Sequence, residues 1–178
     1  MPFDDDPVFE AVGFVADGHL VDADGVTDLT ISRLDGLTAW SAWLPFADAV
    51  AQAPTDPGVY VAREGAAGPI VYVGKAGPRN GKGLRGRLRV YASGKAFTSG
   101  LGEAVADRAL ADPVWLRERL AEVEAGESQR ATSWGRLAFE RAGLHVRWAT
   151  TPDGPGATAL ELACIGALAD VVLWNRRR

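Results

Sequence analysis

Two short stretches in the middle of the chain have the residue pattern of a β-hairpin. Residues 58–63 and 70–74 are rich in valine, tyrosine and isoleucine, which favour strands, and the glycines between them favour a turn. Residues 144–150 alternate between apolar and polar side chains and predict a third strand. These patterns together predict a small, three-stranded, mainly antiparallel sheet.

Helical spacing dominates the rest of the C-terminal two thirds. Leu84 and Leu88 lie one turn apart and predict a helix over 84–91, directly after a glycine-rich loop at 75–83. Residues 101–143 are predicted to form a series of helices, and residues 158–173 one mostly apolar helix that packs against the sheet. Sheet and helices together predict an α/β chain of the α+β type.

Two strong helix boundary signals fall inside the helical segment 101–143. Asp112 is suited to cap a helix whose first position is Pro113, since the missing N–H of proline costs nothing there. That helix is expected to stop near Gly126. A second helix is predicted over 127–142, with Gly143 as its C-terminal cap.

The N-terminal 57 residues give a weaker pattern. Apolar stretches at 8–15 and 26–34 alternate with Asp-Gly pairs, which favour tight turns, so we expect a small hairpin or meander over residues 1–37. A short amphipathic helix is predicted over 40–50, with Pro45 in its first turn.

Length and charge set the domain organisation. The chain has 178 residues, of which 47% are hydrophobic and 24% charged, the balance of one globular domain. Residues 1–57 hold 11 acidic and one basic side chain, a net charge of −10, whereas residues 58–178 hold 12 acidic and 18 basic ones, a net charge of +6. We therefore expect an acidic extension, 1–57, packed on a functional domain, 58–178, with 101–143 as a helical insertion.

The composition excludes several classes of protein. No run reaches the roughly 18 apolar residues that span a bilayer, and the first residues lack the pattern of a signal peptide. Cys164 is the only cysteine, so an internal disulfide and a cysteine-based metal cluster are excluded, and a small buried core residue is the expected role. We expect a cytoplasmic protein without a membrane partner.

A basic stretch marks the loop and helix that follow the hairpin. Residues 65–102 contain no Asp or Glu. Their seven basic residues are Lys75, Arg79, Lys82, Arg85, Arg87, Arg89 and Lys95. Such a surface suits a polyanion, because every neutralised phosphate releases condensed counterions. A solvated helix face explains the same stretch equally well.

The order of several polar residues narrows the function further. Gly58-Val59-Tyr60 and Tyr72-Val73-Gly74 are followed by Lys75, by Arg87 within Leu84-Arg85-Gly86-Arg87-Leu88, and by Tyr91 one turn later. Glu161 then lies in the last predicted helix, and Asn175 follows it. This order resembles the GIY-YIG nuclease family over residues 58–95 and 144–175. The long loop at 77–83 and the segment 101–143 depart from the family's compact pattern.

The resemblance implies a metal-dependent endonuclease, with DNA as the expected substrate. Glu161 would hold one Mg²⁺ or Mn²⁺, which needs only one or two carboxylates, and Arg87 would bind the phosphate. Tyr72 is the candidate general base, although its pKa, about 10 when unperturbed, would have to be lowered by Lys75 and the metal. Tyr60 would orient the water or share that role. Tyr91 and Asn175 would position the others, and the remaining basic residues would contact nucleic acid.

Each of these residues also has a purely structural interpretation. The tyrosines suit ordinary strands, and Arg87 and Lys75 suit solvent. Thr158 and Glu161 have capping-box spacing, which would tie the carboxylate to its own helix end.

Two other functions stay open beside the nuclease. One is a nucleic-acid binding module without significant catalysis, and the other is an interaction protein that uses its acidic N-terminal segment.

Overall fold

The computed structural model describes residues 15–16, 19–20, 23–127 and 129–175, with side chains from residue 29 onward except that of residue 79. Its centre is a four-stranded antiparallel sheet in the order β3-β6-β4-β5. The long strands are β4 (Gly58–Glu64), β5 (Ile70–Ala76) and β6 (Leu144–Thr150). The predicted hairpin and third strand are thus confirmed, with the hairpin slightly longer than expected.

The fourth strand corrects the prediction of three. β3 (Leu44–Pro45) pairs Leu44 with Val146 and Pro45 with His145, at a sheet edge where the missing N–H of proline costs no ladder bond. The helix predicted over 40–50 therefore begins later, as α2 (Phe46–Gln52). β3 adds a strand to the sheet and α2 packs on one face of it. Because both lie within residues 1–57, the acidic extension contributes directly to the core.

Residues 23–35 form a helix where strands were predicted. α1 (Ala23–Asp35) buries Thr30 and Leu34, four residues apart, so the chain here follows helical spacing. The Asp24-Gly25 pair lies within this helix instead of in a turn. The two-residue strands β1 (Val15–Ala16) and β2 (His19–Leu20) do pair antiparallel, while residues 8–14 lie outside the described part of the chain.

The remaining helices follow the predicted signals closely. They are α3 (Gly83–Ala92), α4 (Leu101–Ala111), α5 (Pro113–Glu124), α6 (Ala131–Ala142) and α7 (Gly154–Ala167), with a short 3-10 turn at Arg79–Gly81. Asp112 caps α5 by accepting from the N–H groups of Val114 and Trp115, and Gly143 ends α6 in the left-handed region, as predicted. The helix predicted over 127–142 begins four residues later.

The last helix is displaced relative to its prediction. α7 begins at Gly154 instead of residue 158, because Asp153 accepts from the Gly156 N–H and so caps the helix one turn earlier. It ends at Ala167 instead of residue 173. In the part of the chain that the structure describes, no helix is both long and apolar enough to cross a membrane.

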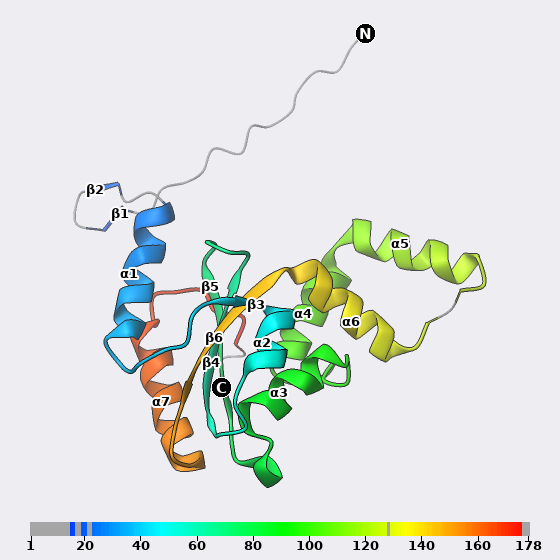
Figure 1. Cartoon of the computed structure of the whole chain (residues 1–178). Coiled ribbons are helices and arrows are strands. Elements are labelled where there is room, and N and C mark those ends of the chain that lie inside the picture. The colour runs from blue at the N-terminus through cyan, green and yellow to red at the C-terminus, as the bar shows by residue number, and fades with distance from the viewer. Residues whose placement is uncertain (1–14, 17–18, 21–22, 128, 176–178) are drawn as a thin grey trace.

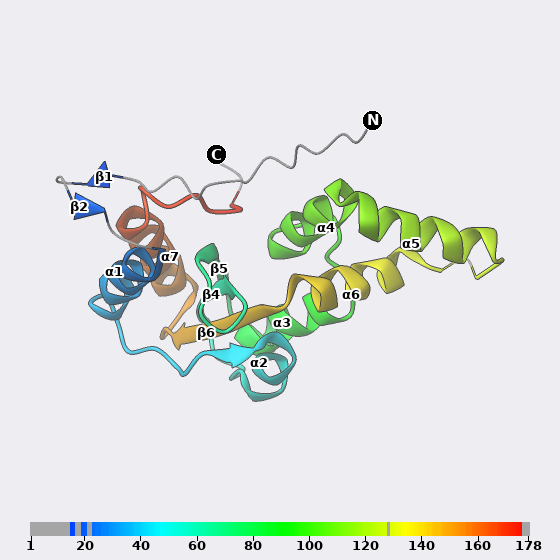
Figure 2. The ribbon, with the colours of Figure 1, turned by 90° about the horizontal axis from the view of Figure 1, so that it is seen from above.

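Helices cover both faces of the sheet (Figures 1 and 2). α1 and α7 lie on one side, where Val59, Val61 and Val73 pack with Cys164 and Leu168. α2, α3 and α4 lie on the other side, where the apolar positions of α3 pack with the tyrosines of the strands. The hairpin of α5 and α6 extends away from this body. Cys164 is fully buried, as predicted.

Candidate functional site

Three tyrosines from three elements meet on the α3 side of the sheet. Tyr60 of β4 lies opposite Gly74 of β5 in the strand register, and its hydroxyl is 2.7 Å from the hydroxyl of Tyr91 on α3. The Tyr60 ring centroid is 6.2 Å from that of Tyr72 and 6.1 Å from that of Tyr91. Any β-carbon at position 74 would collide with the Tyr60 hydroxyl, so the glycine of the second triplet makes room for this cluster.

Arg87 joins the tyrosines from one turn earlier on α3. Its guanidinium carbon lies 4.9 Å from the centroid of the Tyr91 ring, a cation–π distance. Its Nε is buried and finds no hydrogen-bond partner among the described residues. A buried donor of this kind is costly to leave unpaired.

The N-terminus of α4 closes the cluster from the side opposite the sheet. Gly100, with φ +57°, lies so close that an added β-carbon would be 2.7 Å from the Tyr91 hydroxyl and 2.9 Å from Nη2 of Arg87. The same carbon would be 3.3 Å from the Tyr72 hydroxyl. Sequence reasoning missed Gly100. A glycine at the end of the acid-free stretch, just before a helix, was the available signal.

The electrostatics of the tyrosines run opposite to the expectation. Burial raises the pKa of Tyr72 well above its usual range, and the neighbouring Tyr91 and Glu161 add to the rise, while Arg87 opposes it. Burial likewise raises the pKa of Tyr60, which is wholly inaccessible to solvent. Both phenols are therefore neutral at pH 7 in this state. Tyr60, being inaccessible, is placed to hold its neighbours and not to orient a water.

Lys75 and Glu161 meet on the other face of the same strand. Nζ of Lys75 is 2.9 Å from Oε2 of Glu161, and the two side chains are 40% and 19% exposed. The capping-box interpretation is wrong, because Thr158 lies inside α7 and its hydroxyl donates to the Gly154 carbonyl. The Glu161 carboxylate is thus free of its own helix end and lies beside β5.

The strand β5 links these two groups. It is one of the two edge strands of the sheet and carries Tyr72 on its α3 face and Lys75 on its α7 face. The charge of Glu161 contributes to the raised pKa of Tyr72, so the carboxylate lies within electrostatic range of the phenol despite its different face.

Asn175 lies along β5 with its amide fully engaged. Its Nδ2 donates to the Val73 carbonyl at 2.6 Å, and its Oδ1 accepts from the Val73 N–H at 3.0 Å. The Trp174 N–H donates to the Val71 carbonyl at 2.6 Å. The last described residues therefore extend the pairing of the edge strand around Tyr72, which makes Asn175 a positioning residue.

The predicted nucleic-acid contacts divide into tethered and exposed residues. Nε of Arg85 donates to the Ala53 carbonyl at 2.6 Å and ties α3 to the end of α2. Lys82, Arg89 and Lys95 are exposed, and Arg89 follows Arg87 on the same helix. The side chain of Arg79 lies outside the described residues. Exposed basic side chains are thus present on both sides of Arg87 in the sequence.

The donor set for a metal is sparse. Among the described residues, no group of three or more His, Cys, Asp and Glu side chains is gathered in one place. Mg²⁺ needs only one or two carboxylates beside its waters. Glu161 fits that requirement, since only Oε2 faces Lys75 and the side chain is partly exposed.

The comparisons with known proteins add no relative. A scan of family models, a search of curated proteins and a search of solved structures each returned no match.

Proposed function

We propose that this chain is a metal-dependent endonuclease of the GIY-YIG type that hydrolyses phosphodiester bonds in DNA. The proposal is carried by the surroundings of the edge strand β5, where Tyr72 and Arg87 share one face of the sheet and the charge of Glu161, on the other face, still acts on the Tyr72 phenol. The strand pair β4–β5, the basic helix α3 after it and the carboxylate of α7 occur in the order that the resemblance implies.

Arg87 is the phosphate-binding residue in this proposal. Its guanidinium is held against the Tyr91 ring and carries the positive charge that would make a charge-assisted hydrogen bond to a phosphate oxygen. Gly100 and the tyrosines fix the position of the guanidinium before substrate arrives. A preorganised donor of this kind stabilises the charge that develops on the phosphoryl oxygens.

Tyr72 acts as a hydrogen-bonding group for the attacking water and becomes a general base only when cations lower its pKa. Arg87 already opposes the raised pKa. Lys75 does the same once it leaves Glu161, because its ammonium is then uncompensated beside the same strand. Tyr72 would first lose its own proton to solvent, and the resulting phenolate oxygen would accept the proton of the attacking water.

Glu161 would hold Mg²⁺ or Mn²⁺ through its carboxylate, and the ion, when bound, supplies Lewis-acid polarisation of a phosphate oxygen and help for the leaving oxygen. Binding of the ion requires the Glu161 carboxylate to give up its ion pair with Lys75. The pair is partly exposed, where ion pairs contribute about 0–1 kcal/mol, so this exchange costs little.

A supercoiled plasmid incubated with Mg²⁺ tests the proposal. The purified chain should nick the plasmid, and Glu161→Gln should abolish nicking while preserving the fold, because the substitution removes only a charge from the middle of α7. Glu140→Gln, an exposed glutamate on α6, is the matched control and should nick as wild type does. Equal nicking by wild type and Glu161→Gln would refute the assignment.

The neutral, buried phenols and the Lys75–Glu161 ion pair favour one alternative, a binding module of the same fold without significant catalysis. That module would bind DNA with a strong dependence on salt concentration and leave every plasmid intact. The plasmid assay, run beside a binding titration, separates the two functions.

A further inference from the structure

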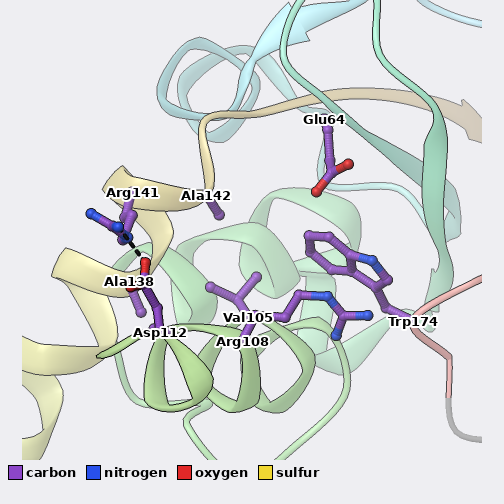
Figure 3. Close-up of a pocket in the computed structure, with 9 residues that line it drawn as sticks. Glu64, Val105, Arg108, Asp112, Ala138, Arg141, Ala142 and Trp174 are labelled. Atoms are coloured by element: carbon purple, nitrogen blue, oxygen red, sulfur yellow. Dashed lines mark hydrogen bonds and ion pairs between the residues drawn. The ribbon is translucent and has the colours of Figure 1, made fainter. Parts of the chain in front are cut away.

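A polar cleft lies beside the candidate site, at the far end of α4. It has a volume of about 210 Å³ and is formed by the end of β4, by α4 and α6, and by Trp174 (Figure 3). Glu64 and Trp174 lie at one end, and the ion pair of Arg141 with Asp112 lies at the other. The cleft is smaller than the roughly 300 Å³ at which sites for drug-sized ligands begin, so it suits a group of nucleobase size.

Arg108 is the feature of this cleft that points to a ligand. Its guanidinium carbon lies 3.8 Å from the centroid of the Trp174 ring, and its Nη1 donates to the Ala104 carbonyl of its own helix at 3.1 Å. It makes no ion pair with any described residue. The guanidinium lies over the indole and the residue is exposed, so part of the side chain is accessible to an incoming base.

An open guanidinium face backed by an indole is a stacking platform. Nucleobases that are free of a duplex stack readily on guanidinium planes and aromatic rings. Glu64 adds a carboxylate that can accept from an exocyclic amine of a base, whereas Asp112 is already committed to Arg141. The cleft thus offers both a surface for the base and a hydrogen-bond acceptor for its edge.

The cleft is connected to the tyrosine cluster through two elements. Gly100 touches the cluster at the N-terminus of α4, and Arg108 is about 12 Å further along, at 1.5 Å per residue. Trp174 is hydrogen-bonded to Val71, next to Tyr72. A strand whose phosphate lies on Arg87 would reach Arg108 in about three to four nucleotides, at 3.4 Å per nucleotide along one strand.

We propose that this cleft binds an unpaired nucleotide of the substrate, with its base stacked on Arg108. The proposal rests on the proposed function and defines its substrate class: DNA with a single-stranded, flapped or bulged segment close to the cleavage point. A base within a continuous duplex is excluded because it is already stacked on both faces.

Fluorescence anisotropy with wild-type protein in EDTA tests the binding without any cleavage. A labelled oligodeoxyadenylate should bind more tightly than a blunt duplex of equal length. Arg108→Ala should weaken binding of the single strand by about five- to a hundredfold, the loss of one base stack, and leave duplex binding nearly unchanged. Arg108→Lys should lose almost as much, because it keeps the charge but not the plane. Arg117→Ala, an exposed arginine of α5, is the matched control.

The proposal is overturned if Arg108→Ala and Arg117→Ala weaken single-strand binding equally, or if Arg108→Ala weakens duplex binding as much as single-strand binding. Thermal unfolding of each variant excludes loss of the fold. Since all titrations are done without metal, failed nicking of plasmid leaves this result standing, and the two proposals fail separately.

Tryptophan fluorescence provides a second measurement that needs no change at Arg108. Deoxyadenosine monophosphate should change the emission of wild type, and Trp174→Phe should remove that change. An equal response to inorganic phosphate would identify a simple anion site and contradict the stacking platform.

Discussion

The contact of Gly100 with the tyrosine cluster gives the sharpest prediction about the site. Gly100 has φ +57° and ψ −135°, a backbone conformation that side chains with a β-carbon rarely adopt. In Gly100→Ala the new carbon would also lie 2.7 Å from the Tyr91 hydroxyl and 2.9 Å from Nη2 of Arg87. Tyr91 cannot move freely, because its hydroxyl is held by Tyr60 and its ring is buried.

Two costs add up in this variant. The strained backbone costs about 1–3 kcal/mol. Crowding a packed site costs a further 1–3 kcal/mol or so. We therefore expect the free energy of unfolding to fall by about 2–6 kcal/mol, a large share of the roughly 5–15 kcal/mol of a typical domain. Because the new carbon would also displace the guanidinium of Arg87, the proposed phosphate-binding residue, the affinity for DNA should fall as well.

Urea unfolding followed by circular dichroism measures this loss, and Gly126→Ala is its matched control. Gly126 also has a positive φ, +80°, but no atom of the described residues lies within 4 Å of its added carbon, so only the backbone cost applies. The control should lose about 1–3 kcal/mol and keep its DNA affinity. Equal losses in the two variants would refute the close packing of α4 against the tyrosines.

Three further predictions concern the core. Burial raises the pKa of Tyr60 and Tyr72, so these phenols ionise at lower pH in the unfolded chain than in the folded one. The free energy of unfolding, measured with urea at several pH values, should therefore be constant with respect to these groups below about pH 10 and fall above it. The fall should be less steep in Tyr72→Phe, which lacks one of the two phenols. Asp35 pairs with the buried Arg147 at 2.6 Å, so Asp35→Asn should lower the free energy of unfolding by about 1–3 kcal/mol. Asp170→Asn, in the exposed pair with Arg33, should lower it by only about 0–1 kcal/mol. Equal losses would contradict the difference in burial. Burial raises the pKa of Cys164 to about 11, so iodoacetamide should label the thiol slowly at neutral pH and rapidly in urea; fast labelling of folded protein would show the helix to be open.

The elements that local signals define were predicted well from sequence. The β-branched strands 58–64 and 70–76, the cap at Asp112 and the glycine at 143 each carry their own physical cause within a few residues. Strand β3 was missed because two residues are too few for a pattern, and α1 was missed because Asp-Gly pairs favour turns unless tertiary packing overrides them. Leu34, fully buried, supplies that packing.

Only part of the candidate site, likewise, could be predicted from the sequence. The order of Tyr60, Tyr72, Arg87 and Glu161 could be read from the chain, but the face that each occupies could not. The alternation of β5 places Tyr72 and Lys75 on opposite faces, and only the assembled sheet brings Glu161 to Lys75. The direction of the Tyr72 pKa was unpredictable for a related reason, because the burial of Tyr72 depends on a tertiary contact with Gly100, 28 residues further along the chain.

A crystal soaked in Mn²⁺ tests the proposed metal site, since anomalous scattering locates the ion without reference to activity. We expect one ion on the Glu161 carboxylate, at about 2.0–2.1 Å from its oxygen, with Lys75 turned away and the Tyr72 hydroxyl facing the same space. An intact Lys75–Glu161 pair with no ion beside it, at Mn²⁺ concentrations that support nicking, would refute the metal site.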